Sequence, residues 1–219
     1  ALLLLLVLLT GCGAKTEEAP WQTAYRETGK YLQEQDALSA GSVGGEWAVI
    51  GLSRAGLLSD ETAQSYEQTV EDYVKQAGSV RLHHAKSTEN SRAILGLTAA
   101  GYNAANMAGV DLTAGLTDMA YLRAQGTNGP IWALIALDCH GYDIPQCADG
   151  EEQTTCEGLV AEILSYQCSD GGWALMGDES DVDMTAMAVQ ALAPYYENAQ
   201  VKAAVDAALT FLAGVQNDD

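Results

Sequence analysis

The sequence predicts an all-α protein assembled from repeated helical hairpins, and two observations support this prediction. A pair of aromatic or aliphatic residues recurs along the chain at steps of 42, 48, 42 and 48 residues. A second kind of segment, apolar and rich in alanine, lies between successive pairs. Internal repetition with a period of about 40–50 residues is typical of stacked helical units. The pairs are Tyr31-Leu32, Tyr73-Val74, Tyr121-Leu122, Ile163-Leu164 and Phe211-Leu212.

The alanine-rich segments align with one another without gaps. They read WAVIGLSRAG (47–56), RAILGLTAAG (92–101), WALIALDCHG (132–141) and MAVQALAPYY (187–196). A helix that is apolar on nearly every side must be buried, whereas the segment 62–76 has the charged face of an amphipathic helix. Gly56, Gly101 and Gly141 suit the C-terminal ends of three buried helices. We therefore expect four hairpins, each with one amphipathic and one buried helix, and the opening helix of a fifth.

The chain begins with the apolar run ALLLLLVLLTG, residues 1–11, directly before Cys12. This run is shorter than the roughly 20 residues of a membrane-spanning helix, but it has the length of the apolar core of a secretory signal. The residues LTGC (9–12) resemble the bacterial lipobox, whose cysteine becomes the lipidated first residue of the mature protein. This resemblance implies a signal peptide over 1–11, a lipidated Cys12 with a tether over 12–20, and a lipid-anchored location outside the cytoplasmic membrane, on the bacterial cell surface.

The formal net charge of −20 limits the partners of the chain. Proteins that bind nucleic acids need clustered lysines and arginines to displace counterions, so no nucleic-acid partner is expected. The same charge disfavours docking of the protein surface on anionic lipid, which leaves the lipid on Cys12 as the contact with the membrane. An acidic, well-hydrated exterior is the simplest explanation of this charge.

Four further cysteines, Cys139, Cys147, Cys156 and Cys168, lie within one stretch of 30 residues. An even number of cysteines in an exported protein favours one or two disulfides. Zinc is an alternative because His140 is nearby, but the cysteines lack the close spacing of common zinc sites, and no metal site is expected. Free buried thiols are the third alternative.

The segment ILSYQ (163–167), followed by GGW (171–173), is similar to the QW repeat of squalene cyclases, in which Gln and Trp tie one helix to the next turn. The repeats resemble the α/α toroid of terpenoid cyclases, protein prenyltransferases and cobalamin carriers, and TENSRAILGLTAAGY and NGPIWALIALD resemble its bacterial surface-protein branch. The resemblance implies one toroid domain over 21–219, in which outer helices wrap an inner ring. A complete toroid holds more hairpins, so we expect the ring to be incomplete here and a further C-terminal part to follow Asp219.

The segment DESDVDMTA (178–186) resembles the DxDDTA motif of class II terpene cyclases, whose middle aspartate protonates an alkene or epoxide. The resemblance assigns Asp183 as the general acid and Asp181 as its acidic neighbour. Such an acid has to stay protonated in a dry site. Met184 replaces the last aspartate of the motif, which removes one carboxylate from the cluster. The structural alternative is that Asp181 or Asp183 caps the helix that begins near Thr185.

The segment 182–188 is also similar to a stretch of cobalamin carriers such as intrinsic factor, where polar groups bind the amides of the corrin rim. This resemblance implies Asp183 and Thr185 as ligand contacts, and Trp173 of the QW-like segment is a further candidate. Arg92 takes the position of a tryptophan in two of the other repeats. An arginine that enters a buried helix needs a carboxylate or a ligand, so Arg92 is expected to form either an ion pair or a ligand contact.

The expected function is a non-catalytic binding or interaction module for a small molecule, such as a corrinoid, or for a surface polymer. This function requires no cofactor. The alternatives are a class II terpene cyclase-like enzyme that uses Asp183, and a structural spacer at the cell surface. Cyclases line their cavities with aromatic faces that stabilise carbocations, whereas only 7% of this chain is aromatic. The fold by itself does not separate these functions, because toroids include both enzymes and carriers.

Overall fold

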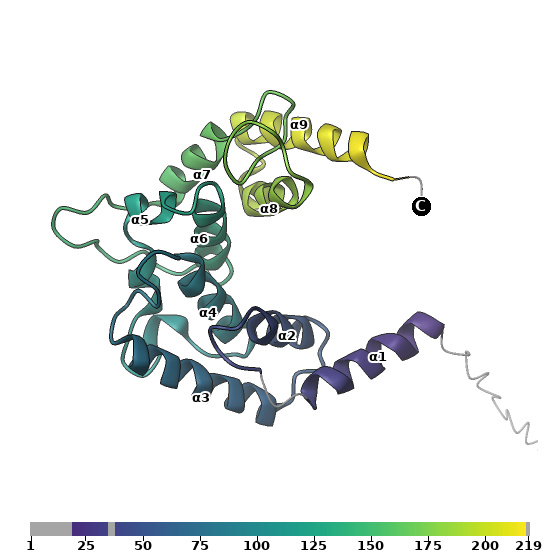
Figure 1. Cartoon of the computed structure of the whole chain (residues 1–219), viewed down its shortest axis with the longest axis vertical. Helices are drawn as coiled ribbons and strands as arrows, with labels where there is room; N and C mark the ends of the chain where they lie inside the picture. The colour runs from purple at the N-terminus through teal and green to yellow at the C-terminus, as the bar shows by residue number, and fades with distance from the viewer. Residues whose placement is uncertain (1–18, 35–37, 218–219) are drawn as a thin grey trace, which may run out of the picture.

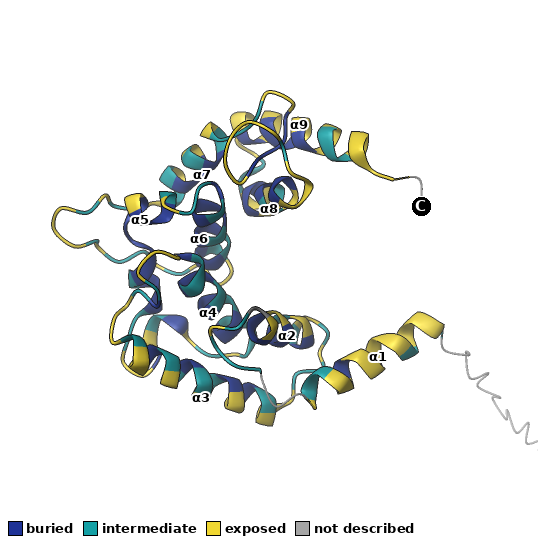
Figure 2. Cartoon of the chain, viewed as in Figure 1, coloured by how far each residue is buried: buried dark blue, intermediate teal, exposed yellow. Residues whose placement is uncertain are grey.

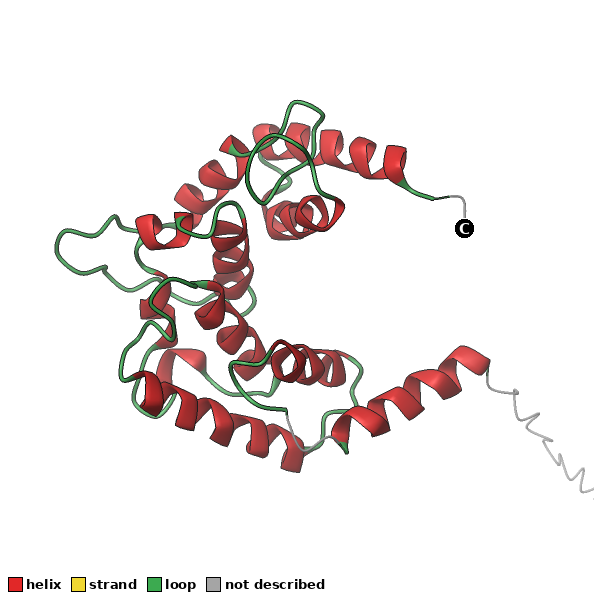
Figure 3. Ribbon diagram, viewed as in Figure 1, coloured by secondary structure: helices red, strands yellow, loops and turns green. Residues whose placement is uncertain are grey.

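A computed structural model describes residues 19–34 and 38–217, which form nine α-helices and three short 3-10 helices. The described residues contain isolated β-bridges but no strand, so the predicted all-α class is confirmed (Figure 3). The α-helices are α1 (Pro20–Gln33), α2 (Val43–Arg54), α3 (Asp60–Ala77), α4 (Thr88–Ala99), α5 (Met119–Arg123), α6 (Asn128–Asp138), α7 (Cys156–Ser165), α8 (Val182–Leu192) and α9 (Ala199–Val215). The 3-10 helices are η1 (Ala104–Asn106), η2 (Leu112–Leu116) and η3 (Ala193–Tyr195).

The helices form two layers that follow an open arc (Figure 1). Helices α2, α4, α6 and α8 lie on the inner side and pack against one another in chain order. Helices α1, α3, α5, α7 and α9 lie on the outer side, with α1 and α9 at the two ends of the arc. The inner helices contain the alanine-rich segments and the outer helices contain the recurring pairs. The described residues thus hold the four expected hairpins and the opening helix of a fifth.

The centre of the inner layer is the most deeply buried part of the molecule (Figure 2). In α6, Ile131, Leu134 and Leu137 are all buried, because α4, α7 and α8 cover this helix from several sides. Side chains of this size each contribute about 1.5–3 kcal/mol to folding when they leave water. The outer helix α1 is different, since Trp21 and Tyr25 are exposed.

Three inner helices end in the same backbone motif. Gly56, Gly101 and Gly141 have positive φ angles of 67°, 87° and 64°, which strain any residue with a Cβ. The N–H after each glycine bonds to a carbonyl five residues earlier, which is the hydrogen bond of the Schellman motif. These bonds run from Leu57 to Leu52, from Tyr102 to Leu97 and from Tyr142 to Leu137, each at 2.9 Å. The repeat seen in the sequence therefore extends to the backbone of the helix ends.

The third hairpin departs from the pattern of an amphipathic helix followed by a buried one. Its outer helix α5 has only five residues, and the preceding chain forms η1 and η2. Asp111 and Asp118 accept hydrogen bonds from backbone N–H groups two residues later. Ala108 and Gly109 turn the chain with positive φ angles. Such local turns compete with a regular helix, which explains why α5 is short.

The predicted signal peptide over 1–11 and the lipidated Cys12 lie outside the described residues, as does most of the tether over 12–20. The first described helix begins at Pro20, next to the expected start of the repeat domain at residue 21. Among the described helices, none combines the length and the apolar character needed to cross a bilayer.

Candidate functional site

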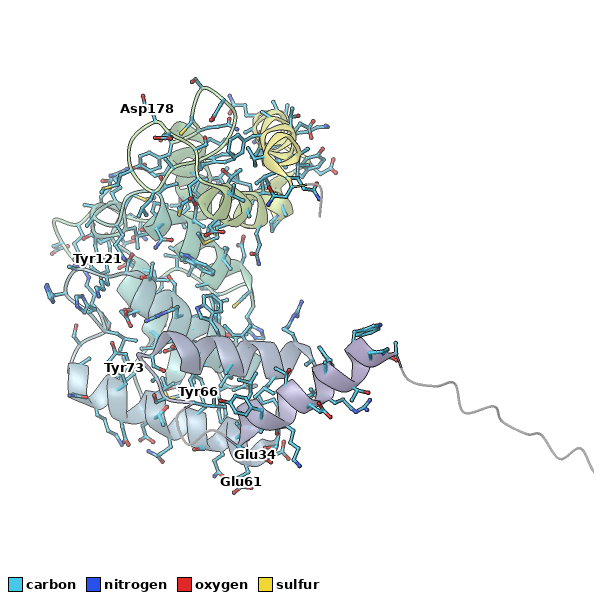
Figure 4. All side chains as sticks on the ribbon, turned by 45° about the vertical axis from the view of Figure 1, so that its right-hand side comes forward. Glu34, Glu61, Tyr66, Tyr73, Tyr121 and Asp178 are labelled. Atoms are coloured by element: carbon cyan, nitrogen blue, oxygen red, sulfur yellow. The ribbon has the colours of Figure 1, made fainter. Side chains whose placement is uncertain are left out.

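The acidic segment before α8 forms the start of that helix. Asp181 is the N-cap, and its Oδ1 accepts a hydrogen bond from the Met184 N–H at 2.8 Å. Asp183 lies in the first turn with an exposed side chain. Because an acid that protonates an alkene has to be shielded from water, this position does not suit the general acid implied by the cyclase resemblance. Figure 4 shows the nearby Asp178 in the loop before α8, at the outer edge of the molecule.

Thr185 and Trp173, two further expected ligand contacts, are fully buried. The Thr185 Oγ1 accepts a hydrogen bond from the Trp173 N–H at 2.9 Å and donates one to the Asp181 carbonyl at 2.7 Å. The Trp173 indole donates to the Ile163 carbonyl in α7 at 2.7 Å. Both side chains therefore hold the loop between α7 and α8 in place and do not reach the surface.

Gln167 of the QW-like segment also links separate elements. Its Nε2 donates to the carbonyls of Gly171 and Ala204, both at 2.8 Å, and Ala204 belongs to α9. Together with Trp173, this side chain connects α7, the following turn and the next outer helix.

Asn90 is a buried side chain that holds the backbone around it in place by hydrogen bonds, and it was not among the residues singled out from the sequence. It occupies the position in α4 that Thr185 occupies in α8 when the alanine-rich segments are aligned. Its Oδ1 accepts from the Leu82 N–H at 2.9 Å, and its Nδ2 donates to the carbonyls of Val80 and Leu112 at 2.6 and 3.0 Å. A polar residue at the same repeat position was the available signal for this structural role.

Arg92 forms an ion pair within α4. Its Nη2 lies 2.6 Å from the Glu89 carboxylate, and the two side chains are 12% and 14% exposed. The Arg92 Nε is buried and has no hydrogen-bond partner among the described residues. An ion pair or a ligand contact was expected for Arg92, and the structure shows the ion pair.

Cys139, Cys147, Cys156 and Cys168 are free thiols in the structure, rather than members of the expected disulfides. Burial raises the pKa of the Cys139 and Cys156 thiols. His140 contacts the Tyr142 ring, with 5.3 Å between the ring centroids. The described residues contain no group of three or more side chains arranged to hold a metal ion.

A groove of about 500 Å³ crosses the concave face of the arc. Each inner helix, together with the residues just after it, contributes three lining residues. In the first three alanine-rich segments, these are the fourth, seventh and eighth positions. We call it the concave groove. Its lining residues are Ile50, Ser53 and Arg54 of α2, Leu95, Thr98 and Ala99 of α4, Ile135, Asp138 and Cys139 at the end of α6, and Gln190, Ala191 and Pro194 in or after α8.

The seventh position of the repeat holds successive hairpins together along the groove. The hydroxyl of Ser53 donates to the Ala99 carbonyl at 2.6 Å. The equivalent Thr98 shares a hydrogen bond of 2.7 Å with the Tyr142 hydroxyl, and the equivalent Asp138 accepts one of 3.1 Å from the Tyr195 hydroxyl. Each of these bonds joins an inner helix to the next repeat, so together they hold neighbouring repeats in place along the groove.

Two residues of the groove, Arg54 and Asp138, carry a charged or polar group without a partner among the described residues. Arg54 is exposed and forms no ion pair with the described residues. The Asp138 Oδ2 is buried and has no hydrogen-bond partner among them. Burial raises the pKa of Asp138, although the hydrogen bond from Tyr195 opposes this shift. The C-terminal ends of α2, α4 and α6 add partial negative charge, which Arg54 offsets.

An aromatic pair lies on the same inner helices, nearer to their N-terminal ends. Trp47 of α2 and Trp132 of α6 occupy the first position of the aligned segments, and their ring centroids are 5.1 Å apart. Trp47 is 38% exposed, so the pair is partly open to solvent. The concave face thus carries both aromatic and aliphatic surface.

The expected contact Asp183 and the concave groove lie at opposite ends of α8. Seven residues separate Asp183 from Gln190, which corresponds to about 10 Å along the helix axis. The site residues proposed from the motif therefore do not line the groove. The groove is instead lined by residues at repeated positions of the alanine-rich segments, and these residues belong to none of the motifs described above.

A second hollow, of about 570 Å³, lies between α1 and α3. Its lining is largely polar and includes Glu34 and Glu61, which Figure 4 shows at this outer edge. The hollow adjoins residues 35–37, which lie outside the described residues. The concave groove is the stronger candidate because its lining repeats from helix to helix and is fully described.

Comparisons with protein-family models, with curated proteins and with solved structures found no match for this chain.

Proposed function

We propose that this chain is an extracytoplasmic lipid-anchored binding module of the α/α toroid type, which takes a small molecule in its concave groove. The observation that carries this proposal is the groove itself, to which all four inner helices contribute. Small-molecule sites are concave and mainly apolar, with a few convergent polar groups. The concave groove combines Ile50, Leu95 and Ile135 with the exposed side chains of Arg54 and Gln190.

The arrangement of the helices supports the toroid type. Inner and outer helices alternate along the chain, and the inner ones follow one another around the concave side (Figure 1). The contacts of Gln167 and Trp173 support the similarity to the QW repeat. The lipobox-like residues before Cys12 support an anchor outside the cytoplasmic membrane, where the concave face would be open to external ligands.

A corrinoid is the first ligand to test. Its flat macrocycle has an apolar face and a rim of amides, which both donate and accept hydrogen bonds. Arg54 and the Gln190 amide nitrogen supply donors at the groove, and the Gln190 amide oxygen supplies an acceptor. The volume of about 500 Å³ lies within the usual range of small-molecule pockets, so we expect one edge of the macrocycle to enter the groove.

The test is retention of cyanocobalamin by the purified chain, measured by gel filtration and the visible spectrum. We expect binding with a micromolar or tighter Kd. Ile135→Glu places a charge against the ligand's apolar face and should weaken binding by about tenfold or more. Asp183→Ala, at the other end of α8, should bind as the wild type does. Circular dichroism checks that both variants are folded.

Each outcome bears on a separate part of the proposal. Retention that Ile135→Glu abolishes supports a corrinoid in the concave groove. Retention that only Asp183→Ala abolishes would move the site to the start of α8, as the resemblance to cobalamin carriers implies. A chain that retains neither cyanocobalamin nor any small molecule from a cell extract would favour the structural spacer.

A further inference from the structure

Glu46 is a buried carboxylate near the start of α2. Only 1% of its surface is exposed. Its Oε1 accepts a hydrogen bond from the Gly41 N–H at 2.7 Å, whereas its Oε2 is buried without a partner among the described residues. A charged carboxylate in this position is unfavourable, because one of its oxygens has lost water and gained no donor.

The neighbours of Glu46 form a polar cluster between three helices. Helix α4 contributes Glu89 and Arg92, and α3 contributes Tyr66 and Tyr73, which Figure 4 shows along that helix. The Tyr66 hydroxyl and the Arg92 Nε are also buried without partners among the described residues. In the described part of α1, no charged group acts on Glu46. The cluster therefore combines two carboxylates with a single guanidinium.

This imbalance of charge determines which carboxylate takes up a proton. Glu89 is paired with Arg92 at 2.6 Å and accepts a further hydrogen bond from the Tyr73 hydroxyl at 3.5 Å. If Glu46 is also ionised, this polar cluster carries one net negative charge. Protonation of Glu46 removes that charge and makes Oε2 or Oε1 a donor, so Glu46 is the group that gains most from a proton.

We propose that Glu46 is a proton-binding site that makes the packing of α2 against α3 and α4 sensitive to pH. Protonated Glu46 keeps the cluster neutral and the helix packed, whereas ionised Glu46 loosens the start of α2. Trp47 follows directly on the same helix, so its contact with Trp132 on the concave face changes with the same proton. This site acts on α2 itself and does not depend on what the concave groove binds.

The direction of the pKa shift agrees with this assignment. Burial raises the pKa of Glu46 above its ordinary value of 4.5 and outweighs the Gly41 N–H and Arg92, which lower it. The folded state then holds the proton at pH values where the unfolded chain has lost it. The resulting stability is complete below pH 4.5 and is lost as the pH rises through the higher pKa of the folded state.

The experiment compares thermal unfolding of the wild type and Glu46→Gln from pH 4.5 to pH 8, above the isoelectric point of about 4.2. Glutamine mimics the protonated acid, so the variant should melt about 2–4 °C or more above the wild type at pH 8. This difference should shrink toward pH 4.5. Asp72→Asn removes an equal charge from the exposed face of α3 and should leave the pH dependence of the wild type unchanged. Parallel curves for wild type and Glu46→Gln overturn the proposal.

A second measurement uses the wild type alone and so does not depend on how the variant folds. In a chain labelled with carbon-13 at the glutamate side chains, one carboxyl resonance should titrate clearly above pH 4.5. The exciton circular dichroism of Trp47 and Trp132 should change over the same pH range. Titration of every glutamate at or below the ordinary value overturns the proton site, and an exciton band that stays constant while Glu46 titrates overturns its link to α2.

Discussion

Thr185 and Asn90 occupy the same repeat position in α8 and α4 and form equivalent contacts. Each buried side chain accepts a hydrogen bond of 2.9 Å from the backbone of the loop before its helix, at Trp173 and at Leu82. A buried N–H without an acceptor is costly, so a polar residue at this position stabilises the connection between two helices. The polar character of Thr185 therefore has a structural cause that is independent of any ligand.

The first prediction concerns Thr185→Val, which keeps the shape of the side chain and removes its oxygen. The Trp173 N–H would lose its acceptor inside the protein. We expect the free energy of unfolding to fall by about 1–3 kcal/mol, measured by urea denaturation. Thr210→Val on the exposed side of α9 is the matched control and should change it by less than about 0.5 kcal/mol. Equal effects of the two substitutions would argue against a role of Thr185 in holding the loop before α8.

Thr185 was an expected ligand contact because segment 182–188 resembles cobalamin carriers, and Trp173 was one because it belongs to the QW-like segment. Spacing alone does not reveal that the loop folds back and uses both side chains for its own hydrogen bonds. Glu46 escaped notice for the same reason. Its burial depends on how α3 and α4 pack over the start of α2, and this arrangement is a tertiary property.

At the scale of elements, the sequence predicted the inner helices well and the third outer helix poorly. Apolar residues and a closing glycine act within one helix, so the segments 47–56 and 92–101 identified α2 and α4 correctly. In the third hairpin, the recurring pair Tyr121-Leu122 suggested an ordinary outer helix. The preceding residues form η2, which Asp111 caps, and Asp118 caps the start of α5, so the helix cannot extend toward its N-terminus.

Two glycines of neighbouring repeats provide a matched test of the helix ends. Gly101 has a φ of 87°, so Gly101→Ala should destabilise the protein by about 1–2 kcal/mol. Gly51 lies inside α2, and a Cβ there would meet no atom within 4 Å. Gly51→Ala should therefore stabilise the protein by about 0.5–1 kcal/mol. Thermal unfolding of both variants checks these opposite signs, and shifts in the same direction would contradict the assigned end of α4.

At the scale of the whole molecule, the curvature of the inner layer turns separate repeat positions into one surface. Ile50, Leu95 and Ile135 each occupy the fourth position of their segment, and all three line the concave groove. The sequence alignment contained these positions, but it could not show that they face one another. That step requires the arc in which α2, α4, α6 and α8 pack in order (Figure 1).

The central claim is that the concave groove binds the ligand, and Cys139 offers the most direct test because it is an exposed residue of the groove lining with a free thiol. The measurement is the rate of Cys139 alkylation in the reduced wild-type chain, followed by peptide mass spectrometry with and without cyanocobalamin. Cys147 lies outside the groove and is the internal control. At a ligand concentration of ten times the Kd, the rate at Cys139 should fall to about one tenth, while the rate at Cys147 stays the same. Unchanged alkylation of Cys139 in a chain that retains the ligand would contradict the claim.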